Sequence, residues 1–125
     1  ACSGHDPDAV VLCVDDDPAV LDITKSLLKK NGYSVLTAAS GNEALNLFQK
    51  YRIDVVVVDY EMPHTKGHEV SAALKMLNPK VPVVLLSGAS DIPATVLQAT
   101  DAFVTKGRSL RVLVGTIAKL IQNPQ

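Results

Sequence analysis

The segment Ile53–Asp59 reads Ile-Asp-Val-Val-Val-Val-Asp and contains the strongest strand signal in the chain. Its four consecutive valines are stiff at χ1 and prefer a pleated, extended backbone. We therefore expect a strand over Ile53–Val58. This strand leads directly into a carboxylate, Asp59.

The rest of the chain alternates short apolar runs with helical patterns. Strands are expected at 9–14, 34–38, 81–86 and 102–105. Helices are expected from Pro18 to Lys30 with Gly32 as the stop, from a capping box at Ser40 and Glu43 to about residue 51, at 70–77, at 93–98, and at 110–121 with Ser109 as the cap. The pattern predicts a single α/β domain of (βα)5 type, with a doubly wound parallel five-stranded sheet.

Size and composition limit the possible functions. The 125 residues and the hydrophobic share of 47% suit one globular domain, which we place at 9–122 between tails at 1–8 and 123–125. The net charge of −1 provides no basic surface for direct nucleic-acid binding. No apolar stretch has the ~20 residues of a membrane span, so we expect a cytoplasmic protein. Cys13 lies in an apolar run, and we favour a buried thiol there over a disulfide with Cys2.

Polar side chains follow the predicted strands at the points where these strands end. Asp15 and Asp16 follow the first strand, Asp59 the third, Ser87 the fourth and Lys106 the fifth. Ligands of open α/β sheets bind outside the carboxyl ends of the strands. We therefore expect these groups to form one site.

The chemistry of this set indicates phosphoryl transfer beside a metal ion. Converging carboxylates repel one another unless a cation lies between them, and hard oxygen ligands favour Mg²⁺ or a similar ion. A carboxylate held there is a possible nucleophile for a phosphoryl group. The charge on the phosphoryl oxygens must then be neutralised, by the metal, Lys106 and Ser87.

These segments resemble the receiver domain of two-component response regulators, and the resemblance extends from Val10 to about Ile121. It is carried by the segments Val-Asp-Asp-Asp-Pro at 14–18, Val-Val-Asp-Tyr-Glu-Met-Pro at 57–63, Leu-Leu-Ser-Gly at 85–88 and Val-Thr-Lys at 104–106. The resemblance implies the sheet order 2-1-3-4-5 of the flavodoxin-like receiver fold. It also implies that Asp59 is the phosphoacceptor.

The resemblance assigns further roles at the site. Asp15, Asp16, Asp59 and the backbone carbonyl of Glu61 would bind Mg²⁺ or Mn²⁺. Ser87 and Phe103 would be switch residues, and Lys106 would contact the phosphoryl group. The implied protein is a signalling domain, not a turnover enzyme.

The resemblance also implies partners. A sensor histidine kinase or a His-phosphotransfer protein would supply the phosphoryl group. An output domain or a second copy would bind through the fourth helix, fifth strand and fifth helix.

Two positions depart from the family pattern. Lys66 stands before Gly67 where an acidic residue is usual, and Gly107 replaces the proline that usually follows the lysine. A cis peptide bond before Gly107 would cost about 3 kcal/mol. These departures leave open a degenerate receiver that acts only as a binding module. A phosphatase of the haloacid-dehalogenase type is a third reading, with Asp15 as its nucleophile.

Several of these residues also have an ordinary structural explanation. Asp17 is expected to cap the helix that begins at Pro18 rather than to bind metal. Phe103 could be a core residue of its strand. The Glu61 side chain is expected to be exposed, with a possible effect on hydrolysis.

Overall fold

The computed structural model describes residues 9–61, 67–88, 93–98, 100–105 and 110–122. Strands and helices alternate along the chain. The elements are β1 (Val10–Val14), α1 (Pro18–Lys30), β2 (Ser34–Ala38), α2 (Gly41–Lys50), β3 (Val55–Asp59), α3 (Gly67–Leu77), β4 (Val83–Ser87), α4 (Ala94–Gln98), β5 (Ala102–Thr105) and α5 (Leu110–Gln122).

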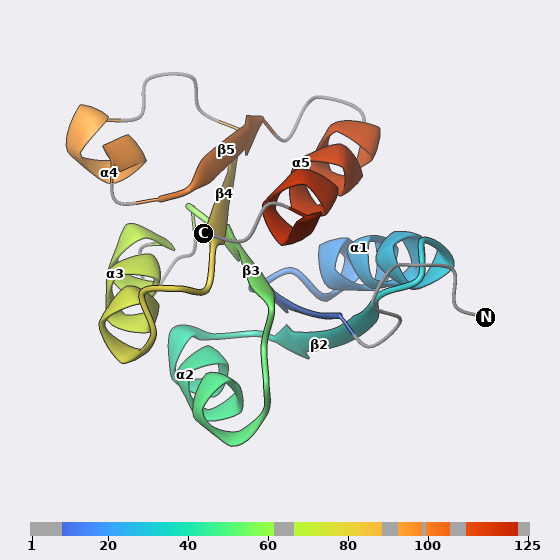
Figure 1. Ribbon diagram of the computed structural model, residues 1–125, viewed down its shortest axis with the longest axis horizontal. Coiled ribbons are helices and arrows are strands. Elements are labelled where there is room, and N and C mark those ends of the chain that lie inside the picture. The colour runs from blue at the N-terminus through green and yellow to red at the C-terminus, as the bar shows by residue number, and fades with distance from the viewer. Residues whose placement is uncertain (1–8, 62–66, 89–92, 99, 106–109, 123–125) are drawn as a thin grey trace.

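The strands form one parallel sheet in the order β2-β1-β3-β4-β5. Helices α1 and α5 cover one face of the sheet, and α2, α3 and α4 cover the other (Figure 1). This arrangement confirms the predicted doubly wound α/β fold. Because all strands are parallel, their carboxyl ends lie along one edge of the sheet, where ligands of such folds bind.

Alternate residues of the central strands enter different cores. Val56 and Val58 of β3 belong to the core under α2 and α3, which includes Leu74. Val55 and Val57 belong to the core under α1 and α5, which includes Leu113. Every residue of β3 and β4 is buried. The site at the strand ends therefore rests on a close-packed, two-sided support.

The ends of the first two helices form as predicted. Asp17 is the N-cap of α1, and its carboxylate accepts the N–H of Ala19 at 3.0 Å. Gly32 follows the end of α1 with φ 94°, a left-handed conformation that favours glycine. At α2, the Ser40 hydroxyl accepts the N–H of Glu43 at 3.2 Å, as predicted, whereas the Glu43 side chain reaches back to the N–H of Ala39 at 2.8 Å, one residue before the cap. None of the described helices is long and apolar enough to cross a membrane.

Two central strands begin two residues later than the sequence predicts. β3 starts at Val55 and β4 at Val83. Pro82 has no N–H for a sheet ladder, although its carbonyl accepts the N–H of Val56 at 3.0 Å. Before β3, the Asp54 carboxylate accepts the N–H of Val10 at 2.7 Å. The contact between this segment and β1 therefore begins with a side-chain acceptor.

Cys13 is a free, buried thiol on β1, as predicted. Burial, with a smaller contribution from the nearby Asp15 carboxylate, raises the pKa of Cys13 from 9.0 to about 12. Because the thiolate is the nucleophilic form, the folded chain holds Cys13 in its unreactive state.

We therefore predict that Cys13 is inert toward iodoacetamide at pH 8 in the folded protein. In a Cys2→Ser background, where Cys13 is the remaining cysteine, labelling should be about a thousandfold slower in the native state than in urea, because burial blocks access of the reagent and the raised pKa lowers the thiolate fraction. Intact-mass spectrometry measures both rates. Comparable native and unfolded rates would contradict the buried, neutral thiol.

Candidate functional site

The strand register places two carboxylates side by side at the carboxyl edge of the sheet. Val14 of β1 pairs with Val58 of β3, so Asp15 and Asp59 are the next residues on neighbouring strands. Both side chains are buried, Asp15 with 4% and Asp59 with 2% of their surface exposed. Buried carboxylates are costly unless they are paired or bind a cation.

Asp16 completes a cluster with these two residues. One carboxylate oxygen from each of Asp15, Asp16 and Asp59 lies within 4.8 Å of the others, and Asp16 is exposed at the rim. Three negative charges at this separation repel one another, and oxygen ligands suit a hard divalent cation. The donor set and spacing therefore fit the metal site that the sequence predicts.

Main-chain hydrogen bonds fix the two buried carboxylates. Asp15 Oδ1 accepts the N–H of Asp17 at 3.0 Å. Asp59 Oδ1 accepts the N–H of Glu61 at 3.1 Å. These short-range bonds orient each carboxylate before any ligand arrives.

Ser87 lies at the end of the strand beside Asp59. Asp59 pairs with Leu86 of β4, so Ser87 is one residue beyond that pair, and its side chain is fully buried. Ser87 also pairs with Thr105, the last residue of β5. The structure therefore brings the predicted hydroxyl to the same edge as the carboxylates.

The Glu61 side chain makes a contact that sequence reasoning missed. Glu61 is exposed, as expected, but its Oε1 accepts the N–H of Gly88 at 3.1 Å. The two residues are 27 positions apart. No sequence pattern signals this bond, because it depends on the neighbouring positions of β3 and β4 and on one side-chain conformation.

Of the two remaining predicted site residues, Phe103 is described by the structure and Lys106 is not. Phe103 on β5 is half-buried and packs against the core under α2 and α3, which fits a core residue. Its switch role stays a prediction. Lys106, with Lys66 and Gly107, lies outside the described residues.

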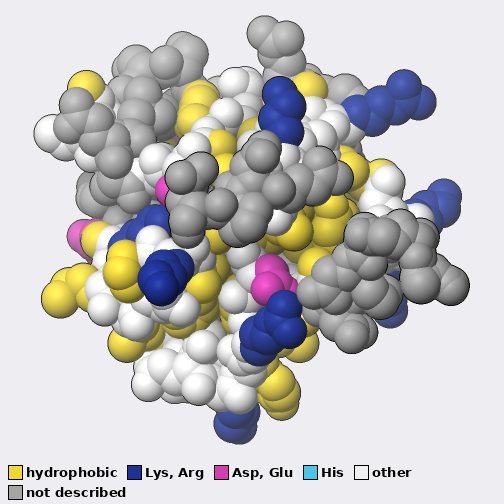
Figure 2. Space-filling model, in the orientation of Figure 1, with side chains coloured by type: hydrophobic (Ala, Val, Ile, Leu, Met, Phe, Trp, Pro, Cys, Tyr) yellow, Lys and Arg dark blue, Asp and Glu magenta, His cyan; other side chains and the backbone are white. Residues whose placement is uncertain are grey.

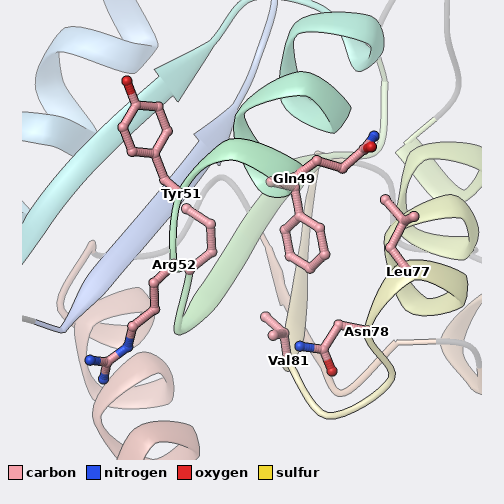
Figure 3. A pocket seen from close by; sticks show the side chains of 8 residues that line it. Gln49, Tyr51, Arg52, Leu77, Asn78 and Val81 are labelled. Carbon is pink, nitrogen blue, oxygen red and sulfur yellow. The ribbon is translucent and has the colours of Figure 1, made fainter.

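Two other features of the described surface were compared with the acidic cluster: its basic side chains and its pocket. Figure 2 shows Lys and Arg side chains of the described residues spread over that face instead of gathered in one patch. A pocket of about 450 Å³ lies where α2 and α3 end (Figure 3). Its lining, which includes Phe48 and Leu77, contains no carboxylate, so the pocket is separate from the acidic cluster.

The sequence and the fold have counterparts in known proteins. Residues 11–118 match the family model of the response regulator receiver domain. The chain belongs to this family. A solved structure of the response regulator TrrA from Thermotoga maritima, in complex with Mg²⁺ and BeF, superimposes with a TM-score of 0.84 at 31% identity, covering 90% of this chain and 98% of that one.

Curated relatives of this receiver domain are longer proteins. The transcriptional regulatory protein GlrR of Escherichia coli is 36% identical over 105 residues, which cover 82% of this chain and 23% of the relative. The probable transcriptional regulatory protein TcrX of Mycobacterium tuberculosis is 31% identical over 115 residues, with coverage of 90% and 49%. The receiver domain thus spans from about a quarter to half of these relatives.

The acidic cluster predicts a stabilising effect of Mg²⁺. At a Mg²⁺ concentration ten times the dissociation constant, binding should add about 1.4 kcal/mol to the free energy of unfolding and raise Tm by a few degrees. In Asp16→Asn, the metal-free protein should be at least as stable as wild type, because one repulsion is removed, and the Mg²⁺-induced rise should shrink or disappear.

Differential scanning calorimetry with and without Mg²⁺ measures both effects. Asp22→Asn is the matched control, because Asp22 is an exposed residue of α1 outside the cluster. An equal Mg²⁺-induced rise in wild type and Asp16→Asn, or no rise in wild type, would contradict a metal site at the cluster.

Proposed function

We propose that this receiver domain accepts a phosphoryl group on Asp59 in a reaction that depends on a divalent cation. The observation that carries the proposal is the buried Asp59 carboxylate, with oxygens of Asp15 and Asp16 within 4.8 Å. Membership of the receiver family supports the same role.

The residues that would hold Mg²⁺, or Mn²⁺, are Asp15, Asp16 and Asp59, together with the backbone carbonyl of Glu61. Oxygen ligands and a partly exposed rim suit Mg²⁺, which keeps several of its waters in protein sites. When bound, the cation neutralises charge on the carboxylates and on the incoming phosphoryl oxygens. TrrA in complex with Mg²⁺ and BeF supports this assignment by similarity.

The proposed reaction begins with a phosphohistidine of a sensor histidine kinase or a His-phosphotransfer protein. An Asp59 carboxylate oxygen forms a bond to phosphorus as the P–N bond breaks. The leaving imidazole nitrogen keeps the electron pair and takes up a proton from solvent. The hydroxyl of Ser87 and the ammonium of Lys106 donate to the phosphoryl oxygens. Later attack by water releases inorganic phosphate and restores the carboxylate. The modification is therefore transient, and the domain serves as a signalling module and not as a turnover enzyme.

We propose that a partner recognises the phosphorylated state at the face formed by α4, β5 and α5. A phosphoryl group draws Ser87 inward at the end of β4, and Phe103 on β5 responds as a switch residue. An output domain or a second copy of the receiver would bind that face in the cytoplasm. The longer transcriptional regulators among its relatives support an output domain.

We predict that acetyl phosphate with Mg²⁺ adds one phosphoryl group to Asp59. Asp59→Asn should abolish the adduct, because it removes the nucleophile. Asp15→Asn should slow its formation but leave Asp59 as the modified residue, because Asp15 serves the metal. Intact-mass and peptide mass spectrometry measure the extent and the position.

Asp22→Asn again provides the control and should react like wild type. Loss of the adduct in Asp15→Asn, together with its persistence in Asp59→Asn, would instead make Asp15 the nucleophile, as in a haloacid-dehalogenase-type phosphatase. Absence of any adduct in the wild type would favour a degenerate receiver.

A further inference from the structure

The side chain of Glu61 joins the ends of two strands across the proposed phosphoacceptor site. Glu61 lies two residues after Asp59, and its Oε1 accepts the Gly88 N–H at 3.1 Å. Gly88 directly follows Ser87, the last residue of β4. The carboxylate therefore connects the chain after β3 with the chain after β4.

The main chain of the same residue contacts the phosphoacceptor. The Glu61 N–H donates to Asp59 Oδ1 at 3.1 Å. Glu61 thus contacts Asp59 through its backbone and the β4 end through its side chain. A change in the charge or position of the Asp59 carboxylate therefore acts on the residue that is hydrogen-bonded to Gly88.

The Gly88 N–H is a donor of the kind that a phosphoryl group requires. It lies beside the Ser87 hydroxyl, two residues beyond Leu86, the strand partner of Asp59. A phosphoryl group adds a charge of about −1.5 to −2 and three strong acceptor oxygens. These oxygens would compete with the Glu61 carboxylate for the same N–H and would repel its charge.

We propose that Glu61 is an acidic latch, whose carboxylate holds the Gly88 N–H in the unmodified domain and releases it to a phosphoryl oxygen when Asp59 is phosphorylated. This inference rests on the proposed function of Asp59. Both partners are exposed, so the bond is weak enough for a phosphoryl group to displace. By linkage, the latch lowers the affinity of the site for a phosphoryl group and couples the arrival of that group to Gly88, the residue after β4.

The space around Gly88 also suits the exchange. A Cβ atom built on Gly88 would lie 3.7 Å from Glu61 Oε1, an ordinary contact distance. Glu61 is an exposed residue, so its carboxylate can move toward solvent when the hydrogen bond breaks.

The first test compares the binding of beryllofluoride, a phosphoryl mimic, at saturating Mg²⁺ by isothermal titration calorimetry. Glu61→Gln keeps an acceptor and removes the charge, and Glu61→Ala removes both. Each should bind beryllofluoride about threefold to fivefold more tightly than wild type. Glu69→Gln removes one charge from an exposed position of α3 and should stay within about twofold of wild type, because its side chain makes no bond of this kind to the part of the chain that the structure describes.

The second readout needs neither metal nor phosphoryl mimic. In NMR spectra of the metal-free domain, the Gly88 amide proton should move upfield in Glu61→Ala, because it loses its acceptor, and should not move in Glu69→Gln. An unchanged Gly88 resonance in Glu61→Ala would overturn the latch. Unchanged or weaker beryllofluoride binding in both Glu61 variants would also overturn it.

Failure of the latch is distinguishable from failure of the proposed function. Wild-type binding of beryllofluoride that is lost in Asp59→Asn supports the phosphoacceptor, whatever the Glu61 variants do. Absence of wild-type binding, or equal binding in Asp59→Asn, would overturn the phosphoacceptor and the latch together.

Discussion

The repulsion among three carboxylates is the constraint on which this receiver domain depends. Asp15 and Asp59 are almost completely buried, and Asp16 adds a third charge within 4.8 Å. Like charges at this separation repel one another, and a cation placed between them would offset the repulsion. The relief of this repulsion by a divalent cation is the physical reason for which we propose the cluster as a cation site.

The sheet makes this concentration of charge possible. β3 and β4 are buried along their whole length, and their valines and leucines pack into cores on both faces. In these two strands the polar residues, Asp59 and Ser87, occupy the last position. Parallel pairing with a fixed register then places Asp15 beside Asp59 and Ser87 one step further along the same edge. Side-chain acceptors such as Asp54, which binds the N–H of Val10 on the neighbouring strand, complete the pairing at the opposite edge.

The sequence predicts the fold well because its local signals agree with one another. The valine run, the cap at Asp17, the box at Ser40 and the stop at Gly32 each act within a few residues, so their outcome is local. The convergence of Asp15, Asp16, Asp59 and Ser87 follows from a general property of parallel sheets and needs no side-chain detail.

What the sequence does not predict depends on tertiary structure. The starts of β3 and β4 depend on which backbone groups find partners, and Pro82 shows that a missing N–H delays a strand. The bond from Glu61 to Gly88 joins residues 27 positions apart and requires one particular side-chain conformation. It turns an exposed residue with no sequence signal into a connection between two strand ends.

The central claim is that the carboxylates at the ends of β1 and β3 form a single divalent-cation site around Asp59. The most direct measurement is a crystal structure of the domain soaked with Mn²⁺, with the ion located by its anomalous signal. We expect one ion that is bound by carboxylate oxygens of Asp15, Asp16 and Asp59. An ion held elsewhere, or held at the cluster without Asp59, would contradict it.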